Sequence, residues 1–237
     1  MPRPTRFGGL IAMRLLAVGE CMAELSPSET AGHYRLGFAG DTFNTAWYAA
    51  RLLPAGSVAY FTRLGDDPAS ADLRRFAEAG QIDTRHISTE VGGTLGLYMI
   101  TLKDGERSFT YWRGQSAARH LADDPAALAA AMAEAEIVYV SGITMAILAP
   151  AARDALLGEL ETARAAGRTI AFDPNLRPRL WSNPDDMRAE VMRTAALCHL
   201  ALPSFEDEAE WFGDADPVAT AARYRAAGAE AVIVKNG

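Results

Sequence analysis

The second half of the sequence alternates short apolar runs with strongly helical segments, and this alternation restricts the fold more than any other feature. The predicted helices cover residues 123–136, 150–167, 183–196 and 216–228, and the predicted strands cover 137–143, 168–175, 198–204 and 231–237. Asn183 is a suitable cap for one helix, and Pro150 a suitable first residue for another. Apolar strands that alternate with capped helices indicate an α/β fold, with a parallel sheet covered on both faces and right-handed crossovers.

The first half supplies further elements of the same kind but departs from the rhythm twice. Residues 14–20 and 57–65 are predicted core strands, and residues 41–53 and 68–80 are predicted helices. Residues 21–40 and 94–113 contain short mixed or alternating runs without helical character. Asp104-Gly105 separates two alternating runs and is the usual hairpin turn. We therefore expect a small antiparallel sheet outside the main layer.

The composition excludes several classes of function. The chain has 237 residues, 49% of them hydrophobic, and a net charge of −7 without a Lys/Arg cluster, which argues against a nucleic-acid partner. No apolar run is long enough to cross a membrane, and residues 1–12 are expected to be a disordered extension before a fold that begins near Met13. Two cysteines without zinc spacing suggest a reducing, cytoplasmic environment. The sequence lacks a P-loop, a G-x-G-x-x-G fingerprint and a G-x-S-x-G elbow.

Polar side chains follow the predicted strands, where an open parallel sheet binds its ligands. Residues 173–179 contain Asp, Asn and two Arg between prolines, and a rigid cationic loop suits anion recognition. Residues 203–208, 235–237 and 141–142 follow the other strands. Solvated connections between strands and helices would explain the same pattern.

Two further segments offer ligand-binding groups. Gly40 permits a close backbone approach ahead of a helix, Asp41 or Thr42 can cap that helix, and Asn44 lies in its first turn. In the hairpin, alternation places Phe109, Tyr111 and Arg113 on one face of their strand, and Tyr98 on a face of the partner strand. A set of two tyrosines and an arginine suits a polyhydroxylated acid. A plain capped helix and a half-buried aromatic face remain open as alternatives.

Taken together and in order, these segments resemble the ribokinase-like PfkB carbohydrate kinases over residues 13–237. The matching segments are LLAVGECMAEL, FAGDTFNTAWYAARL, FTRLGDD, GLYMI, FTYWR, FDPNLRPRLW, LPSFEDEAEWFGD and VIVKNG. The Tyr98, Tyr111–Arg113 and DPNLRPRLW set resembles the 2-keto-3-deoxygluconate kinase branch, whereas fructokinases and ribokinases share the remainder.

The resemblance implies a three-layer α/β/α core with a small β-sheet lid formed by residues of about 21–38 and 92–113. It implies transfer of the γ-phosphoryl group of ATP to a sugar hydroxyl, with Mg²⁺. The implied sugar-binding residues are Gly40, Asp41, Thr42, Phe43, Asn44, Tyr98, Tyr111, Trp112 and Arg113, with Arg113 pairing the carboxylate of a sugar acid. The implied nucleotide-binding residues are Asn175, Leu176, Arg177, Lys235 and Gly237, with Arg177 also catalytic.

The sequence departs from the family pattern at two places. The usual Asn-x-x-Glu motif for metal and phosphate is replaced by PSFEDE, in which Ser204 pairs with Asp207 or, one residue on, Glu208, so the metal ligands stay unassigned. The Gly-Ala-Gly-Asp segment, which supplies the anion hole and the catalytic base, is expected beyond Gly237. The chain as given is therefore expected to be inactive without that Asp.

Three questions stay open from the sequence. A fructokinase-like enzyme has the same expected fold, but a neutral hexose gives Arg113 no anion to pair. A non-catalytic sugar-binding fragment is a second alternative. Lid sheets can pair between protomers, which leaves a homo-oligomer open.

Overall fold

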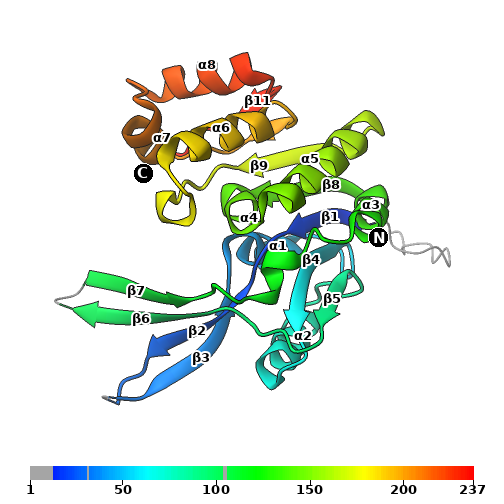
Figure 1. Cartoon of the computed structure of the whole chain (residues 1–237), viewed down its shortest axis with the longest axis vertical. Coiled ribbons are helices and arrows are strands. Elements are labelled where there is room, and N and C mark those ends of the chain that lie inside the picture. Colours follow the sequence, from blue (N-terminus) through cyan, green and yellow to red (C-terminus); the bar gives the residue numbers. More distant parts are fainter. Residues whose placement is uncertain (1–12, 31, 104–105) are drawn as a thin grey trace, which may run out of the picture.

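The computed structural model describes residues 13–30, 32–103 and 106–237, and its main sheet is parallel throughout (Figure 1). Within these ranges seven strands lie in the order β11-β10-β9-β8-β1-β4-β5, and every neighbouring pair is parallel. The strands are β1 (Met13–Val18), β4 (Val58–Gly65), β5 (Ile87–Glu90), β8 (Ala135–Ser141), β9 (Thr169–Asp173), β10 (Leu200–Ala201) and β11 (Ala231–Val232). Strand β1 lies inside the sheet, and the chain adds β4 and β5 on one side of it and then β8 to β11 on the other.

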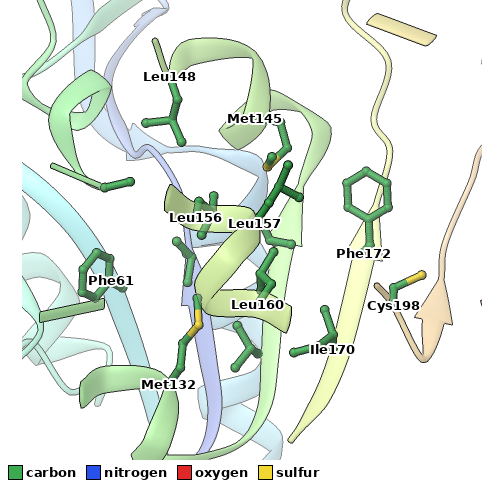
Figure 2. Packing of buried hydrophobic residues seen from close by; sticks show 14 of the residues in the cluster. Phe61, Met132, Met145, Leu148, Leu156, Leu157, Leu160, Ile170, Phe172 and Cys198 are labelled. Carbon is green, nitrogen blue, oxygen red and sulfur yellow. The ribbon is translucent and has the colours of Figure 1, made fainter. Parts of the chain in front are cut away.

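Helices cover both faces of this sheet. They are α1 (Asp41–Leu52), α2 (Pro68–Ala79), α3 (Pro125–Glu134), α4 (Gly142–Ile147), α5 (Pro150–Ala165), α6 (Pro184–Ala195), α7 (Phe205–Phe212) and α8 (Pro217–Ala227). Alternation along β1 separates two cores: Leu16 and Val18 pack on one side, and Leu15 and Ala17 on the other. Figure 2 shows part of the first core, where Leu157 and Leu160 of α5 lie on the side of Ile170 and Phe172 of β9, while Met132 of α3 packs nearer to β1 and β8. The predicted three-layer α/β/α architecture is confirmed.

The predicted helix starts follow from local capping. Asp67 accepts a hydrogen bond from the amide of Ala69 (2.9 Å), and Asn183 accepts one from the amide of Asp186 (2.9 Å). Asp124 and Asp216 cap α3 and α8 in the same way, and a proline begins each of these helices. Short polar caps followed by proline therefore fix where the chain leaves a loop and enters a helix.

A second sheet projects from the core, and we call it the lid (Figure 1). Its described strands lie in the order β3-β2-β6-β7: β2 (Met22–Pro27), β3 (Tyr34–Ala39), β6 (Leu97–Lys103) and β7 (Glu106–Trp112). The β2–β3 and β6–β7 pairs are antiparallel as expected, but β2 and β6 pair in parallel. The expectation of a purely antiparallel sheet is wrong, because both hairpins leave the core in the same direction. The predicted Asp104-Gly105 turn and the extension over residues 1–12 lie outside the described residues.

Other expectations need correction near the ends of strands. Strand β10 has two residues, far fewer than the predicted 198–204, and Pro203 beyond it has no amide proton to donate. Strand β11 is equally short. The polar stretch after β10 is the helix α7 rather than a loop, and Ser141 caps the short helix α4 directly after β8. In the part of the chain that the structure describes, no helix combines the length and apolar character needed to cross a bilayer.

Candidate functional site

A cavity of about 440 Å³ lies between the carboxyl ends of the core strands and the lid. Strand β1 is where the strand order reverses, and this is the position at which open α/β sheets bind ligands. The core contributes Glu20, Gly40, Asp41, Asn44, Asn175, Arg177, Arg179 and Leu180, and the lid with its connection contributes Met22, Tyr98, Phe109, Tyr111 and Arg113.

The start of α1 forms the first wall of the cavity. A Cβ atom at Gly40 would lie 2.2 Å from the carbonyl oxygen of Glu20, so only glycine allows this approach of the two segments. Asp41 accepts a hydrogen bond from the amide of Thr42 at 2.8 Å, and Asn44 stands in the first turn. The predicted positions of Gly40, Asp41 and Asn44 thus converge on the cavity.

The loop after β9 is joined to that wall by side-chain hydrogen bonds. Asn175, whose backbone is left-handed with a φ of 36°, donates from Nδ2 to Oδ2 of Asp41 at 2.8 Å. Its amide donates to Oδ1 of Asp173 at 3.2 Å, and Lys235 Nζ lies 2.7 Å from Oδ2 of Asp173. Burial raises the pKa of Asp173, and Lys235 partly opposes the rise. The four residues form a continuous polar chain from α1 to the segment after β11.

Arg177 stands beside this chain with its guanidinium half-exposed. Its Nη1 donates to the carbonyl of Leu176 at 2.5 Å and lies 3.6 Å from Oδ2 of Asp207 on α7. The same side chain lines the cavity. The guanidinium of Arg177, oriented by these two contacts of Nη1, has further N–H groups that suit a phosphate oxygen.

Aromatic rings form the wall on the lid side. The centroid of Tyr98 lies 5.7 Å from that of Tyr111 and 6.2 Å from that of Phe109. The hydroxyl of Tyr98 donates to Glu24, and burial together with this carboxylate raises the pKa of Tyr98. Arg179 reaches the lid from the core, with its guanidinium carbon 5.9 Å from the centroid of Tyr111.

A buried ion pair links the core to the end of the lid. Arg113, just after β7, donates to Oε2 of Glu20, and the side chain of Glu20 is only 1% exposed. Burial raises the pKa of Glu20 while Arg113 opposes the rise. Oε1 of Glu20 and Nε of Arg113 have no hydrogen-bond partner among the described residues. Arg113, which the resemblance assigned to the carboxylate of a sugar acid, is therefore already paired with a carboxylate of the protein.

Sequence reasoning did not single out Glu20, and it included Arg179 only as one of the two arginines of the cationic loop at 173–179. It placed Phe109 on the lid face without a role. Glu20 stands at the carboxyl end of the first predicted strand, so the rule applied to the other strands would have found it. No comparable signal marks Phe109 beyond its alternation with Tyr111.

Several predicted residues lie away from the cavity. Thr42, Phe43 and Leu176 are buried in the core, and Thr42 is hydrogen-bonded to Tyr60 at 3.0 Å. Trp112 alternates with Tyr111, is 53% exposed and does not line the cavity. Lys235 lies beyond the cavity beside Asp173, and Gly237 does not line the cavity either. The positions of Thr42, Phe43, Leu176 and Trp112 therefore do not support direct contact with a ligand in this cavity.

The possible metal ligands differ in their availability. Glu208 is fully buried, where it accepts hydrogen bonds from Arg223 (2.7 Å) and from the hydroxyl of Tyr224 (3.0 Å). Asp207 is partly exposed beside Arg177. Over the described ranges, no group of three or more His, Cys, Asp or Glu side chains is arranged to hold a metal ion. Of the two registers read from the sequence, only the one with Asp207 leaves a carboxylate accessible.

Comparisons with known proteins bear on this site. The family model described as "pfkB family carbohydrate kinase" matches residues 12–237. A 2-dehydro-3-deoxygluconokinase from Escherichia coli (strain K12) is 35% identical over 232 residues, covering 96% of this chain and 74% of the relative. A fructokinase from Klebsiella pneumoniae is 28% identical over 214 residues, covering 90% and 67%. The crystal structure of a PfkB protein from Polaromonas sp. JS666 is similar with a TM-score of 0.84 at 32% identity, covering 95% of this chain and 77% of that chain.

Proposed function

The chain belongs to the pfkB family of carbohydrate kinases, and on this basis we propose that it phosphorylates a sugar acid. The proposed reaction transfers the γ-phosphoryl group of ATP to the 6-hydroxyl of 2-dehydro-3-deoxygluconate (2-keto-3-deoxygluconate), giving the 6-phosphate and ADP. Relatives that carry the corresponding name are 33–36% identical to this chain, whereas the Klebsiella pneumoniae fructokinase is 28% identical.

One observation carries the choice of substrate: the cavity is lined by three guanidinium groups and two carboxylates, together with tyrosine rings. A cationic excess suits an anionic ligand, and tyrosine hydroxyls suit its hydroxyl groups. The volume of about 440 Å³ is in the range of small-molecule sites. A neutral hexose would leave the extra positive charge without a partner.

The proposed roles follow the positions of the side chains. Gly40, Asp41 and Asn44 hold the sugar from the core side, and Tyr98 and Tyr111 hold it from the lid. Arg177, whose guanidinium lies next to Asp207, stabilises the charge on the transferred phosphoryl group.

The nucleotide is proposed to lie on the far side of Arg177 from the sugar. Lys235 borders this edge through its contact with Asp173, the same carboxylate that accepts a hydrogen bond from the backbone amide of Asn175. Positioning and charge stabilisation of this kind account for most of the catalysis in phosphoryl transfer.

Mg²⁺ is proposed as the metal that accompanies ATP. Mg²⁺ keeps several waters and binds through one or two carboxylates and the phosphates of the substrate, so a closed cage of protein ligands is not required. Asp207 fits this arrangement because it is accessible, whereas Glu208 does not because Arg223 and Tyr224 occupy its carboxylate. When bound, the ion would neutralise charge on the phosphates.

A cytoplasmic location and an oligomer formed through the lid complete the proposal. Both cysteines, Cys21 and Cys198, are free and buried, which is compatible with a reducing compartment. Several large apolar side chains of the lid are exposed, including Tyr34, Leu36 and Trp112. Light scattering of the purified chain measures the oligomeric state.

Isothermal titration calorimetry tests the proposed function on this chain. We expect 2-dehydro-3-deoxygluconate to bind more tightly than fructose, and ATP with Mg²⁺ to bind independently of either sugar. Tighter binding of fructose would favour the fructokinase-like alternative. Binding of the sugar acid without any binding of ATP would favour a non-catalytic sugar-binding protein.

A further inference from the structure

The three arginines that line the cavity differ in how far protein carboxylates already neutralise them. Arg113 is paired with Glu20, and both side chains are nearly buried, with 11% and 1% exposure. Arg177 lies 3.6 Å from Asp207. Arg179 has no carboxylate within 4.0 Å in the part of the chain that the structure describes. Among the three arginines of the cavity, Arg179 is therefore the one without a protein carboxylate of the described ranges beside its guanidinium.

The backbone of Arg179 is also held in a defined position. It belongs to the 3-10 turn η2 (Pro178–Leu180), which is closed by hydrogen bonds from the amide of Leu180 to the carbonyl of Arg177 (2.9 Å) and from the amide of Trp181 to the carbonyl of Pro178 (3.0 Å). The proline restricts the backbone further. The ring of Tyr111, at 5.9 Å, supports the guanidinium from the lid. A cation held between core and lid is suited to a ligand enclosed by both.

We propose that Arg179 is the specificity-determining residue that selects an acidic over a neutral sugar, by pairing with the ligand carboxylate beside Tyr111. This inference rests on the proposed function of the site. A ligand carboxylate near Arg113 would be repelled by Glu20. An acidic ligand would therefore gain little binding energy at Arg113 over a neutral one. At Arg179 a ligand carboxylate is attracted by the guanidinium without a protein carboxylate beside it. The guanidinium fork can bind that carboxylate with two parallel hydrogen bonds.

The test compares the affinities of variants for an acid and a neutral sugar. The variants are Arg179→Gln, Arg179→Lys, Arg113→Gln and, as a matched control, Arg75→Gln on the outer face of α2, where Arg75 pairs with Asp72. Calorimetry gives the dissociation constants for 2-dehydro-3-deoxygluconate and for fructose, at low and at high ionic strength. Thermal unfolding of each variant reports any loss of structure.

We expect Arg179→Gln to weaken binding of the acid by about tenfold while fructose binding changes by less than about twofold. Arg179→Lys should recover part of the loss, because a lysine supplies the charge but not the fork. The salt dependence of acid binding should decrease in Arg179→Gln, and Arg75→Gln should match the wild type in all measurements.

The outcomes separate this inference from the function on which it rests. If the wild type binds fructose and not the acid, the proposed function fails and the inference fails with it. If the wild type prefers the acid and Arg179→Gln keeps that preference, only the inference is overturned. An equal loss for both sugars, or a loss of preference in Arg113→Gln alone, also overturns it.

Discussion

Asn175 donates a hydrogen bond of 2.8 Å to Asp41 across a separation of 134 residues in the sequence. The bond joins the loop after β9 to the first turn of α1, and both segments line the cavity. It therefore sets the distance between the part of the site assigned to the sugar and the part assigned to the phosphates.

Replacement of Asn175 by Ala and by Gly separates the two contributions of this residue. Both variants lose the bond to Asp41, at a cost of about 1 kcal/mol, but only Ala must also adopt the left-handed backbone, which adds about 1–2 kcal/mol. We expect Asn175→Ala to have the lower free energy of unfolding in urea, and both variants to bind the sugar acid more weakly. Equal stability of the two variants would show that the backbone carries no strain at this position.

We expect the difference in stability between the wild type and Asp173→Asn to depend on pH. Burial raises the pKa of Asp173 in the folded state, so the folded protein binds this proton more tightly than the unfolded chain does. The stability that results is fully present below the unfolded pKa and is lost as the pH rises through the folded pKa. Asp173→Asn removes this loss. We expect the stability of the variant, relative to the wild type, to improve from about pH 4 to pH 7 in urea unfolding at each pH. A constant difference, or a decline towards pH 7, would contradict the raised pKa.

The Glu20–Arg113 pair is expected to stabilise the contact between core and lid. Removal of one partner leaves a buried charge unpaired, so Glu20→Ala and Arg113→Ala should each lower the free energy of unfolding by about 3–5 kcal/mol. The double variant should lose clearly less than the sum of the two. Additive losses in this double-mutant cycle would mean that the two side chains act independently. Glu20→Gln, which keeps an acceptor, should cost less than Glu20→Ala.

Tyr111 and Trp112 provide a matched pair for the orientation of β7. The two neighbours have similar exposure, 42% and 53%, but only Tyr111 lines the cavity. Tyr111→Ala should weaken sugar binding by about tenfold, because it removes a ring that contacts both Tyr98 and Arg179. Trp112→Ala should leave the calorimetric dissociation constant within about twofold of the wild-type value. A larger effect of Trp112→Ala would place the sugar on the opposite face of the lid.

The parts of the fold that depend on local signals could be predicted from the sequence. Residues such as Asn183 and Pro150 mark helix starts because capping acts within one turn, and the α/β alternation follows from apolar periodicity. Helix α7 was missed because its first turn is a run of acidic residues after a proline, which is equally typical of a loop.

The parts that depend on distant partners could not be predicted in this way. The parallel pairing of β2 with β6 and the ion pair of Glu20 with Arg113, 93 residues apart, are decided by the assembled sheet. Family resemblance indicated Arg113 as a ligand for a carboxylate, but it carried no information on the protein carboxylate already beside it. Family resemblance, rather than strand ends or alternation, assigned Gly40, Asp41 and Tyr98 to one ligand, and all three line the same cavity.

The parallel pairing inside the lid also has a consequence for how the chain folds. Tyr98 and Glu24 meet in the lid although they are 74 positions apart in the sequence, and the residues between them include α1, β4, α2 and β5 of the core as well as β3 of the lid. Pairings of such high contact order form slowly, because the loop between the partners must be ordered first. We therefore expect the hairpins β2–β3 and β6–β7 to form early and separately, and to join only after the core has brought their bases together. On a refolding time course, the capacity to bind a ligand would then appear after the bulk of the helical signal.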